Sequence, residues 1–165
     1  MKHLSCLSIA LAASVLLIST LVMAAGDGRP VAPQQVAASA QEDQSYPLFT
    51  QMCSKCHDAA RITGQRRNKF EWEEVINKMI EKGAMGTEKD FETVYDFLLR
   101  NFGKVDVNRA PAEELIMVLA LPAKDAEAIV AYRKANGSFA DYEAVAKVPG
   151  IDVKKLETHK DALTF

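Results

Sequence analysis

Five consecutive residues, Cys53-Ser54-Lys55-Cys56-His57, constrain this chain more than any other stretch. They spell C-x-x-C-H, in which two thiols are separated by two residues and followed directly by an imidazole. Thiols at this spacing can add to the two vinyl groups along one edge of a haem, and the next histidine can then bind the iron. We therefore expect one covalent haem c, with Cys53 and Cys56 as attachment sites and His57 as the proximal ligand.

A redox-active dithiol or a zinc half-site would use the same two cysteines. A thioredoxin-like dithiol is expected in a βαβ setting, which the hydrophobic pattern of this chain lacks. A zinc site needs further Cys or His ligands, and the sequence offers only Cys6, His3 and His159 beyond the motif. Haem is therefore the preferred interpretation of the motif.

The N-terminal segment, residues 1–24, has the pattern of a secretory signal. Lys2 and His3 precede an apolar stretch from Leu4 to Met23, and Ala24 closes a small-residue cleavage site. We expect cleavage and export to a periplasm; the alternative is an uncleaved membrane anchor, because about 20 apolar residues can cross a bilayer. Residues 25–44 are rich in Ala, Gln, Pro and Gly, which predicts a flexible linker.

Residues 45–103 have the pattern of a small helical domain. A short helix leads into the haem motif, a polar loop is expected over 58–69, and a second helix over 70–82 should end at Gly83. Thr87 is the expected cap of a third helix. The third helix carries an apolar stripe at helical spacing that should face a core, formed by Phe91, Val94, Tyr95, Leu98, Leu99 and Phe102.

The C-x-x-C-H motif, a helix with Trp72 and an aromatic last helix together resemble a small class I cytochrome c domain. The resemblance implies a methionine as the sixth iron ligand. Met79 stands where the short members of that family carry it, and Met85 lies in the loop where longer members present theirs; an open iron is the remaining alternative. Arg61 and Arg66 are candidates for contact with the haem propionates.

Residues 104–165 follow a different pattern, with an opening Val107-Asn108-Arg109-Ala110, a Leu-Pro hairpin, an Ala-Tyr-Arg helix end and a Pro-Gly-Ile hairpin. This order resembles the tandem helix-hairpin-helix domain of the periplasmic competence DNA receptor family. The resemblance implies that the backbone amides of each hairpin approach a phosphate of DNA. Its aromatic residues are expected in the core, namely Tyr132, Phe139 and Tyr142.

The hairpins depart from the Gly-x-Gly design that such phosphate contacts use. Asp125 is expected where a phosphate should approach the first hairpin, and Asp152 replaces a glycine of the second. Residues 104–165 hold nine Lys and Arg against ten Asp and Glu, a formal net charge of −1, whereas duplex binders usually present a basic face. We therefore expect weak DNA binding at most, with contacts from Lys124, Gly150, Lys154 and Lys155, and otherwise a protein-docking module.

The sequence as a whole predicts an all-α protein in which a small cytochrome c fold is followed by a compact helix-hairpin-helix domain. Its formal net charge of −2 gives no indication of a nucleic acid partner. Of its three cysteines two belong to the C-x-x-C-H motif, so no set of disulfides is expected. The expected function is one-electron transfer to a redox partner protein, as an electron carrier and not as an enzyme. One alternative is a periplasmic DNA-binding or DNA-uptake protein whose haem is structural or regulatory; a second is a haem peroxidase or haem-based sensor.

Overall fold

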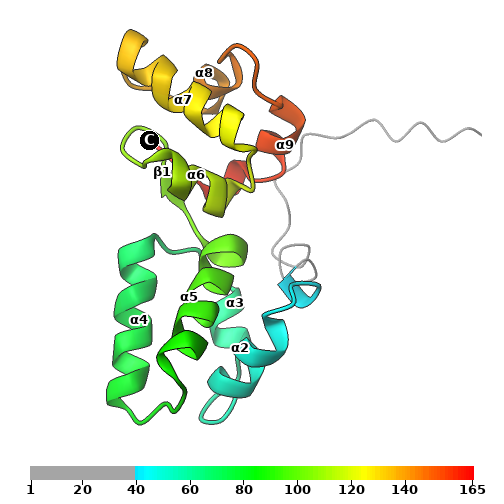
Figure 1. Cartoon of the computed structure of the whole chain (residues 1–165), viewed down its shortest axis with the longest axis vertical. Helices are drawn as coiled ribbons and strands as arrows, with labels where there is room; N and C mark the ends of the chain where they lie inside the picture. The colour runs from blue at the N-terminus through cyan, green and yellow to red at the C-terminus, as the bar shows by residue number, and fades with distance from the viewer. Residues whose placement is uncertain (1–39) are drawn as a thin grey trace, which may run out of the picture.

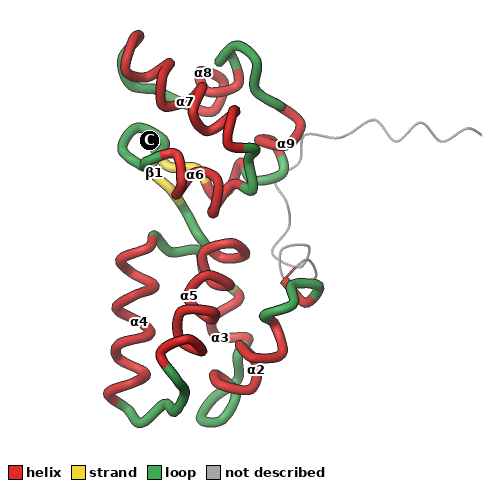
Figure 2. The backbone as a smooth tube through the Cα atoms, viewed as in Figure 1, coloured by secondary structure: helices red, strands yellow, loops and turns green. Residues whose placement is uncertain are grey.

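The computed structural model describes residues 40–165, which form two helical lobes, one above the other in Figure 1. The N-terminal lobe contains α2 (Tyr46–Cys53), α3 (Ala60–Thr63), α4 (Lys69–Glu81) and α5 (Glu88–Phe102). The C-terminal lobe contains β1 (Val105–Asp106), α6 (Ala112–Leu119), α7 (Ala123–Asn136), α8 (Tyr142–Ala146), α9 (Val153–Glu157), the 3-10 helix η1 (Lys160–Ala162) and β2 (Leu163–Thr164). The predicted all-α class is confirmed, since the described residues are mostly helical and their two strands hold two residues each (Figure 2).

Side-chain caps fix where the two long N-terminal helices begin. Asn68 accepts hydrogen bonds from the first turn of α4, while Glu71 bonds back to the Asn68 amide and completes a capping box. Thr87 and Asp90 form the same box at the start of α5, where we predicted the cap. Gly83 follows α4 with φ +92°, a left-handed conformation that glycine adopts without strain. Within the predicted polar loop, α3 forms an additional short helix.

The core of the N-terminal lobe is aromatic. Phe49 of α2 stacks on Phe97 of α5, with ring centroids 4.6 Å apart, and the indole N–H of Trp72 donates to the Phe102 carbonyl at 3.0 Å. Phe97 lies outside the stripe that the sequence predicts, because α5 packs against α2 as well as α4. Conversely, Tyr95 of that stripe is only half-buried.

The predicted linker ends earlier than residue 44. Ala40 is buried, and the Asp43 carboxylate accepts hydrogen bonds from Arg100 and from Asn101 of α5. Residues 40–44 therefore belong to the fold, because Asp43 fastens them to the last turns of α5. Residues 1–39, which include the expected signal segment, lie outside the described residues.

The C-terminal lobe has its own apolar core, to which every helix of the lobe and both strands contribute residues. β1 and β2 run parallel, with Val105 opposite Leu163 and Asp106 opposite Thr164. This pairing brings the two ends of the domain together. The fully buried core residues include Val107, Leu115, Leu119, Ala126, Ile129, Val145 and Leu156.

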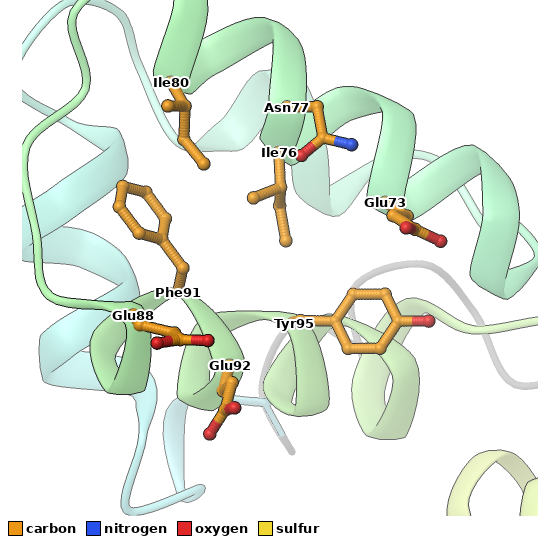
Figure 3. A pocket seen from close by; sticks show the side chains of 8 residues that line it. All are labelled: Glu73, Ile76, Asn77, Ile80, Glu88, Phe91, Glu92 and Tyr95. Carbon is orange, nitrogen blue, oxygen red and sulfur yellow. The ribbon is translucent and has the colours of Figure 1, made fainter.

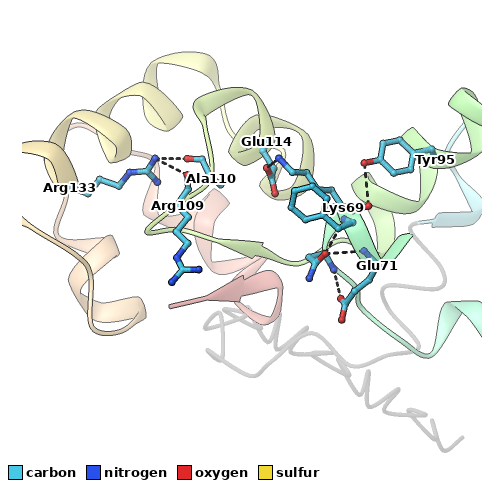
Figure 4. Close-up of polar contacts among 9 residues, drawn as sticks. Lys69, Glu71, Tyr95, Arg109, Ala110, Glu114 and Arg133 are labelled. Carbon is cyan, nitrogen blue, oxygen red and sulfur yellow. Dashed lines mark hydrogen bonds and ion pairs between the residues drawn. The ribbon is translucent and has the colours of Figure 1, made fainter. Parts of the chain in front are cut away.

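The two lobes touch through several specific contacts. Arg66 pairs with Asp161 at 2.8 Å, and its guanidinium also donates to the carbonyls of Asn101 and Gly103. Lys69 at the start of α4 pairs with Glu114 of α6 at 2.6 Å (Figure 4). These bonds hold the N-terminal lobe against α6 and against the C-terminal end of the chain. Among the described residues, no helix combines the length and apolar character that crossing a membrane requires.

Candidate nucleic-acid interface

Two side chains, those of Asn108 and Arg133, hydrogen-bond to backbone groups of distant segments and so hold together the part of the C-terminal lobe that carries the hairpins. Asn108 pairs with both backbone groups of Phe139: its Oδ1 accepts from the amide at 2.7 Å and its Nδ2 donates to the carbonyl at 2.9 Å. Arg133 of α7 donates to the carbonyl of Val107 and to that of Ala110, the latter drawn in Figure 4. The Val-Asn-x-Ala opening and the Tyr-Arg helix end thus bind each other, which explains why both occur in one motif.

The first hairpin joins α6 to α7 through Ala120, Leu121 and Pro122. Ala120 adopts a left-handed conformation with φ +48°, Leu121 is buried, and Pro122 precedes the first residue of α7. The left-handed residue of the turn is therefore Ala120, directly before the Leu-Pro pair of the predicted hairpin. The amides of Ala123 and Lys124 open α7, where an α-helix leaves N–H groups without intrahelical partners.

The second hairpin repeats this design before α9. Gly150 takes the left-handed position with φ +85°, Ile151 packs against the core, and Asp152 caps α9 by accepting from the Lys155 amide at 3.2 Å. A Cβ on Gly150 would meet no atom within 4 Å. The backbone at Gly150 therefore faces open space, where another molecule could approach it closely.

Asp125 joins the two hairpins. It is fully buried, and its Oδ2 accepts a hydrogen bond from the backbone amide of Asp152 at 2.8 Å. Lys124, directly before it, keeps its ammonium 4.0 Å from the other carboxylate oxygen and remains largely exposed. The first turn of α7 is thereby fixed beside the second hairpin.

The expectation that Asp125 opposes an approaching phosphate is wrong. Its carboxylate points into the protein, where it satisfies an amide of the second hairpin, and none of it reaches solvent. The Asp152 carboxylate is exposed but is bonded within its own turn as the cap of α9. The sequence shows two acids at the hairpins, yet only the tertiary structure shows that both serve backbone amides.

The four candidates for DNA contact lie on the two segments that the hydrogen bond between Asp125 and the Asp152 amide joins. Lys124 stands on the first turn of α7, and Gly150 lies two residues before the Asp152 amide that Asp125 binds. Lys154 and Lys155 are exposed on α9 directly after that amide. Three exposed lysines and an open glycine turn therefore lie on the two segments that this hydrogen bond joins, although the lobe as a whole carries no net positive charge.

The C-x-x-C-H motif occupies the end of α2 and the turn after it. Both thiols are free; Cys53 is half-buried and Cys56 is exposed. Burial raises the pKa of the Cys53 thiol to about 11, so that it is protonated at neutral pH. The Nδ1 of His57 lies 3.1 Å from the Asp58 carbonyl oxygen, which leaves Nε2 for an iron atom. This donor set fits covalent haem, and no group of three His, Cys, Asp or Glu among the described residues could hold a metal ion.

The two methionines proposed as sixth ligand differ in position. Met79 is half-buried on α4, whereas Met85 is 73% exposed in the loop between α4 and α5. That loop lies near the motif, because a Cβ on Gly86 would meet the terminal methyl group of Met52 at 2.6 Å. Of the two arginines expected at the propionates, Arg61 is exposed, and Arg66 is engaged in the bonds between the lobes.

Sequence reasoning does not identify the residues that organise the C-terminal lobe. Asn108 and Arg133 belong to the motif that carries the resemblance, but their partners are backbone groups that lie at least 23 residues away along the chain. Asp125 gives a misleading signal, since an acid at a turn normally faces solvent. The one feature of the sequence that could have indicated the burial of Asp125 is its position on the apolar face of α7.

Two families match different parts of the chain. Residues 100–164 match the family described as helix-hairpin-helix motif. Residues 24–95 match the family described as quinohemoprotein amine dehydrogenase A, alpha subunit, haem binding. Each match covers less than half of the chain. The C-terminal lobe accordingly carries the helix-hairpin-helix motif.

Curated relatives resemble a limited part of the chain. ComE operon protein 1 of Bacillus subtilis is 42% identical over 60 residues, which are 36% of this chain and 29% of that protein. An uncharacterized protein of Haemophilus influenzae is 40% identical over 63 residues, 38% of this chain and 56% of its own length. The chain thus spans less than two thirds of either relative. No solved structure matches.

These matches correct the main functional expectation. The helix-hairpin-helix match and the ComE operon relative favour the DNA-binding alternative over the electron carrier. The interpretation of the chain as a cytochrome whose task is one-electron transfer to a redox partner, with the second domain as its docking module, is therefore wrong.

Proposed function

We propose that this protein binds DNA through the paired hairpins of its C-terminal lobe and is a binding protein, not an enzyme. The observation that carries the proposal is the Asp125 to Asp152 hydrogen bond, which fixes both hairpins side by side. A phosphate could approach the first-turn amides of α7 and the open Gly150 turn from the same side. The helix-hairpin-helix match and the name of the ComE operon relative support this proposal.

The local charge around the hairpins agrees with such binding better than the total charge does. Lys124, Lys154 and Lys155 are exposed there, against one exposed carboxylate, that of Asp152, and the buried carboxylate of Asp125. Three lysine contacts to phosphates would give a moderate salt dependence, because each neutralised phosphate changes the slope of log K against log salt by about 0.9. The proposed contact is with the DNA backbone and carries no base specificity.

The test is a titration of a fluorescently labelled duplex of about 20 base pairs with the protein purified from cells that express the full chain. We expect a Kd between about 10⁻⁶ and 10⁻⁴ M at physiological salt, the range of non-specific binding. Lys154→Ala with Lys155→Ala should weaken binding and reduce the salt slope by about 2. Lys134→Ala, at the far end of α7, is the matched control and should bind as the wild type does. Absence of binding at 10⁻⁴ M protein, or equal losses in both variants, would refute the proposal.

We further propose that the N-terminal lobe carries one haem c, bound covalently by Cys53 and Cys56 with His57 as the iron ligand. The haem-binding family match over residues 24–95 and the free donor set at the end of α2 support this assignment. Met79 is the proposed sixth ligand, with Met85 as the alternative. When bound, the haem would add apolar mass to a lobe of about 60 residues, a size at which domains often need such support. Its proposed role is structural or regulatory, and export by residues 1–24 would provide the compartment.

A further inference from the structure

A groove of about 620 Å³ runs between α4 and α5, on residues that neither the hairpins nor the haem motif use. Its apolar part comes from Ile76 and Ile80 of α4 and Phe91 of α5, whose side chains point toward one another in Figure 3. Ile80 is 43% exposed, an unusual exposure for an isoleucine that faces a neighbouring helix. The groove therefore leaves apolar surface in contact with water.

The rim of the groove is acidic. Glu73 of α4 and Glu88 and Glu92 of α5 line it, and no Lys or Arg does. The only cation paired with these three carboxylates in the described part of the chain is Lys89, whose ammonium lies 3.2 Å from Glu92 and is 82% exposed. Burial, followed by the negative charges of Glu73 and Glu114, raises the pKa of Tyr95, which also lines the groove. The groove thus combines an apolar floor with a negative potential.

We propose that this groove binds a basic amphipathic helix of a partner protein. Glu73 and Ile80 are seven residues apart on α4, a length of about 10 Å, which matches about two turns of a helix in the groove. Apolar side chains at i, i+3 or i+4, and i+7 of that helix would contact Ile76, Ile80 and Phe91. Its lysines or arginines would meet the three glutamates. The residues that line the groove include none of the hairpins, the C-x-x-C-H motif or the two candidate methionines, and the three carboxylates would repel DNA phosphates and haem propionates.

The probe is a fluorescein-labelled 14-residue peptide of Leu and Lys with leucines at helical spacing, titrated with the full-chain protein. Glu88→Gln with Glu92→Gln should weaken binding about fivefold to tenfold, since two exposed ion pairs are lost. Glu74→Gln with Glu81→Gln, which removes the same charge from positions of α4 outside the groove, should bind as the wild type does. Ile80→Ser should also weaken binding. Because Ile80 is partly exposed, we expect this variant to fold, and circular dichroism checks that it does.

Three outcomes would overturn the proposal. The first is equal binding by the groove and control variants, which would show adsorption to an acidic surface. The second is that a peptide of the same composition, but with its leucines out of helical spacing, binds as tightly as the designed peptide. Such a result would show that the apolar side chains of the groove do not contribute to binding. The third is a concentration-dependent dimer of the wild type that Ile80→Ser dissolves in sedimentation equilibrium, which would make a second copy the occupant.

Discussion

The buried carboxylate of Asp125 accepts a hydrogen bond from the backbone amide of Asp152, 27 residues further along the chain, at 2.8 Å. The bond connects the first turn of α7 with the hairpin before α9. It also leaves the second oxygen of Asp125 buried without a hydrogen-bond partner. Asp125 is therefore a positioning residue for the two hairpins, and the hydrogen bond that it accepts from the Asp152 amide explains why an acid stands beside a proposed DNA-binding surface.

Asp125→Ala should destabilise the C-terminal lobe and weaken DNA binding together. The substitution leaves the Asp152 amide without an acceptor, which lowers the free energy of unfolding by about 1–3 kcal/mol. Asp125→Asn retains an acceptor oxygen and should lose less. Urea unfolding and duplex titration measure the two effects, with exposed Glu127→Ala of α7 as the control. A fully stable Asp125→Ala protein with unchanged affinity would contradict the positioning role.

Gly103→Ala should destabilise the connection between the lobes. A Cβ at Gly103 would overlap the carbonyl oxygen of Leu99 and crowd Val118 of α6. Relief of this overlap requires a backbone shift, with a loss of about 1–3 kcal/mol in the free energy of unfolding. Thermal unfolding of Gly64→Ala provides the comparison, because a Cβ at Gly64 meets no atom within 4 Å. Equal melting temperatures of the two variants would show that the close contact of Gly103 with Leu99 and Val118 does not affect stability.

The Asp43 carboxylate should make the N-terminal lobe sensitive to acid. Burial by itself raises its pKa, but hydrogen bonds from Arg100, the Ser45 amide and Asn101 outweigh burial and hold the pKa below the ordinary value. A lowered pKa in the folded state gives stability that is complete above the ordinary pKa of about 3.9 and is lost as the pH falls below it.

Asp43→Asn should therefore be less stable than the wild type at pH 7, and the difference between the two should shrink as the pH falls below about 4. Urea unfolding across this range measures the difference. Glu42→Gln changes an exposed neighbour and should show no such convergence. A constant difference at every pH would mean that the charge of Asp43 does not contribute.

Cys53→Ala with Cys56→Ala should abolish covalent haem. When the full chain is exported in cells with haem-maturation machinery, intact-protein mass spectrometry should show one added haem on the wild type and none on the double variant. Met85→Ala should keep the added mass, because the thioether bonds do not involve it. A wild-type protein without haem from the same cells would remove the haem proposal and leave the DNA-binding proposal intact.

The sequence by itself determines the features that depend on neighbouring residues. Thr87 and Asp90 stand three residues apart, so the start of α5 could be predicted from the geometry of a single helical turn. The C-x-x-C-H spacing predicts covalent haem, and the order of short motifs after residue 104 indicates the helix-hairpin-helix domain. None of these inferences requires a contact between distant segments.

Only the tertiary structure decides what the distant polar groups do. Asp125 is buried because an amide 27 residues away needs an acceptor, and Arg66 bonds to Asp161 because the 3-10 helix at the end of the chain lies against the N-terminal lobe. Phe97 is a core residue because α5 packs against α2 as well as α4. Each outcome depends on where a second segment lies in space. Burial of a polar group costs free energy when the group has no hydrogen-bond partner, and this cost is offset when the second segment supplies that partner.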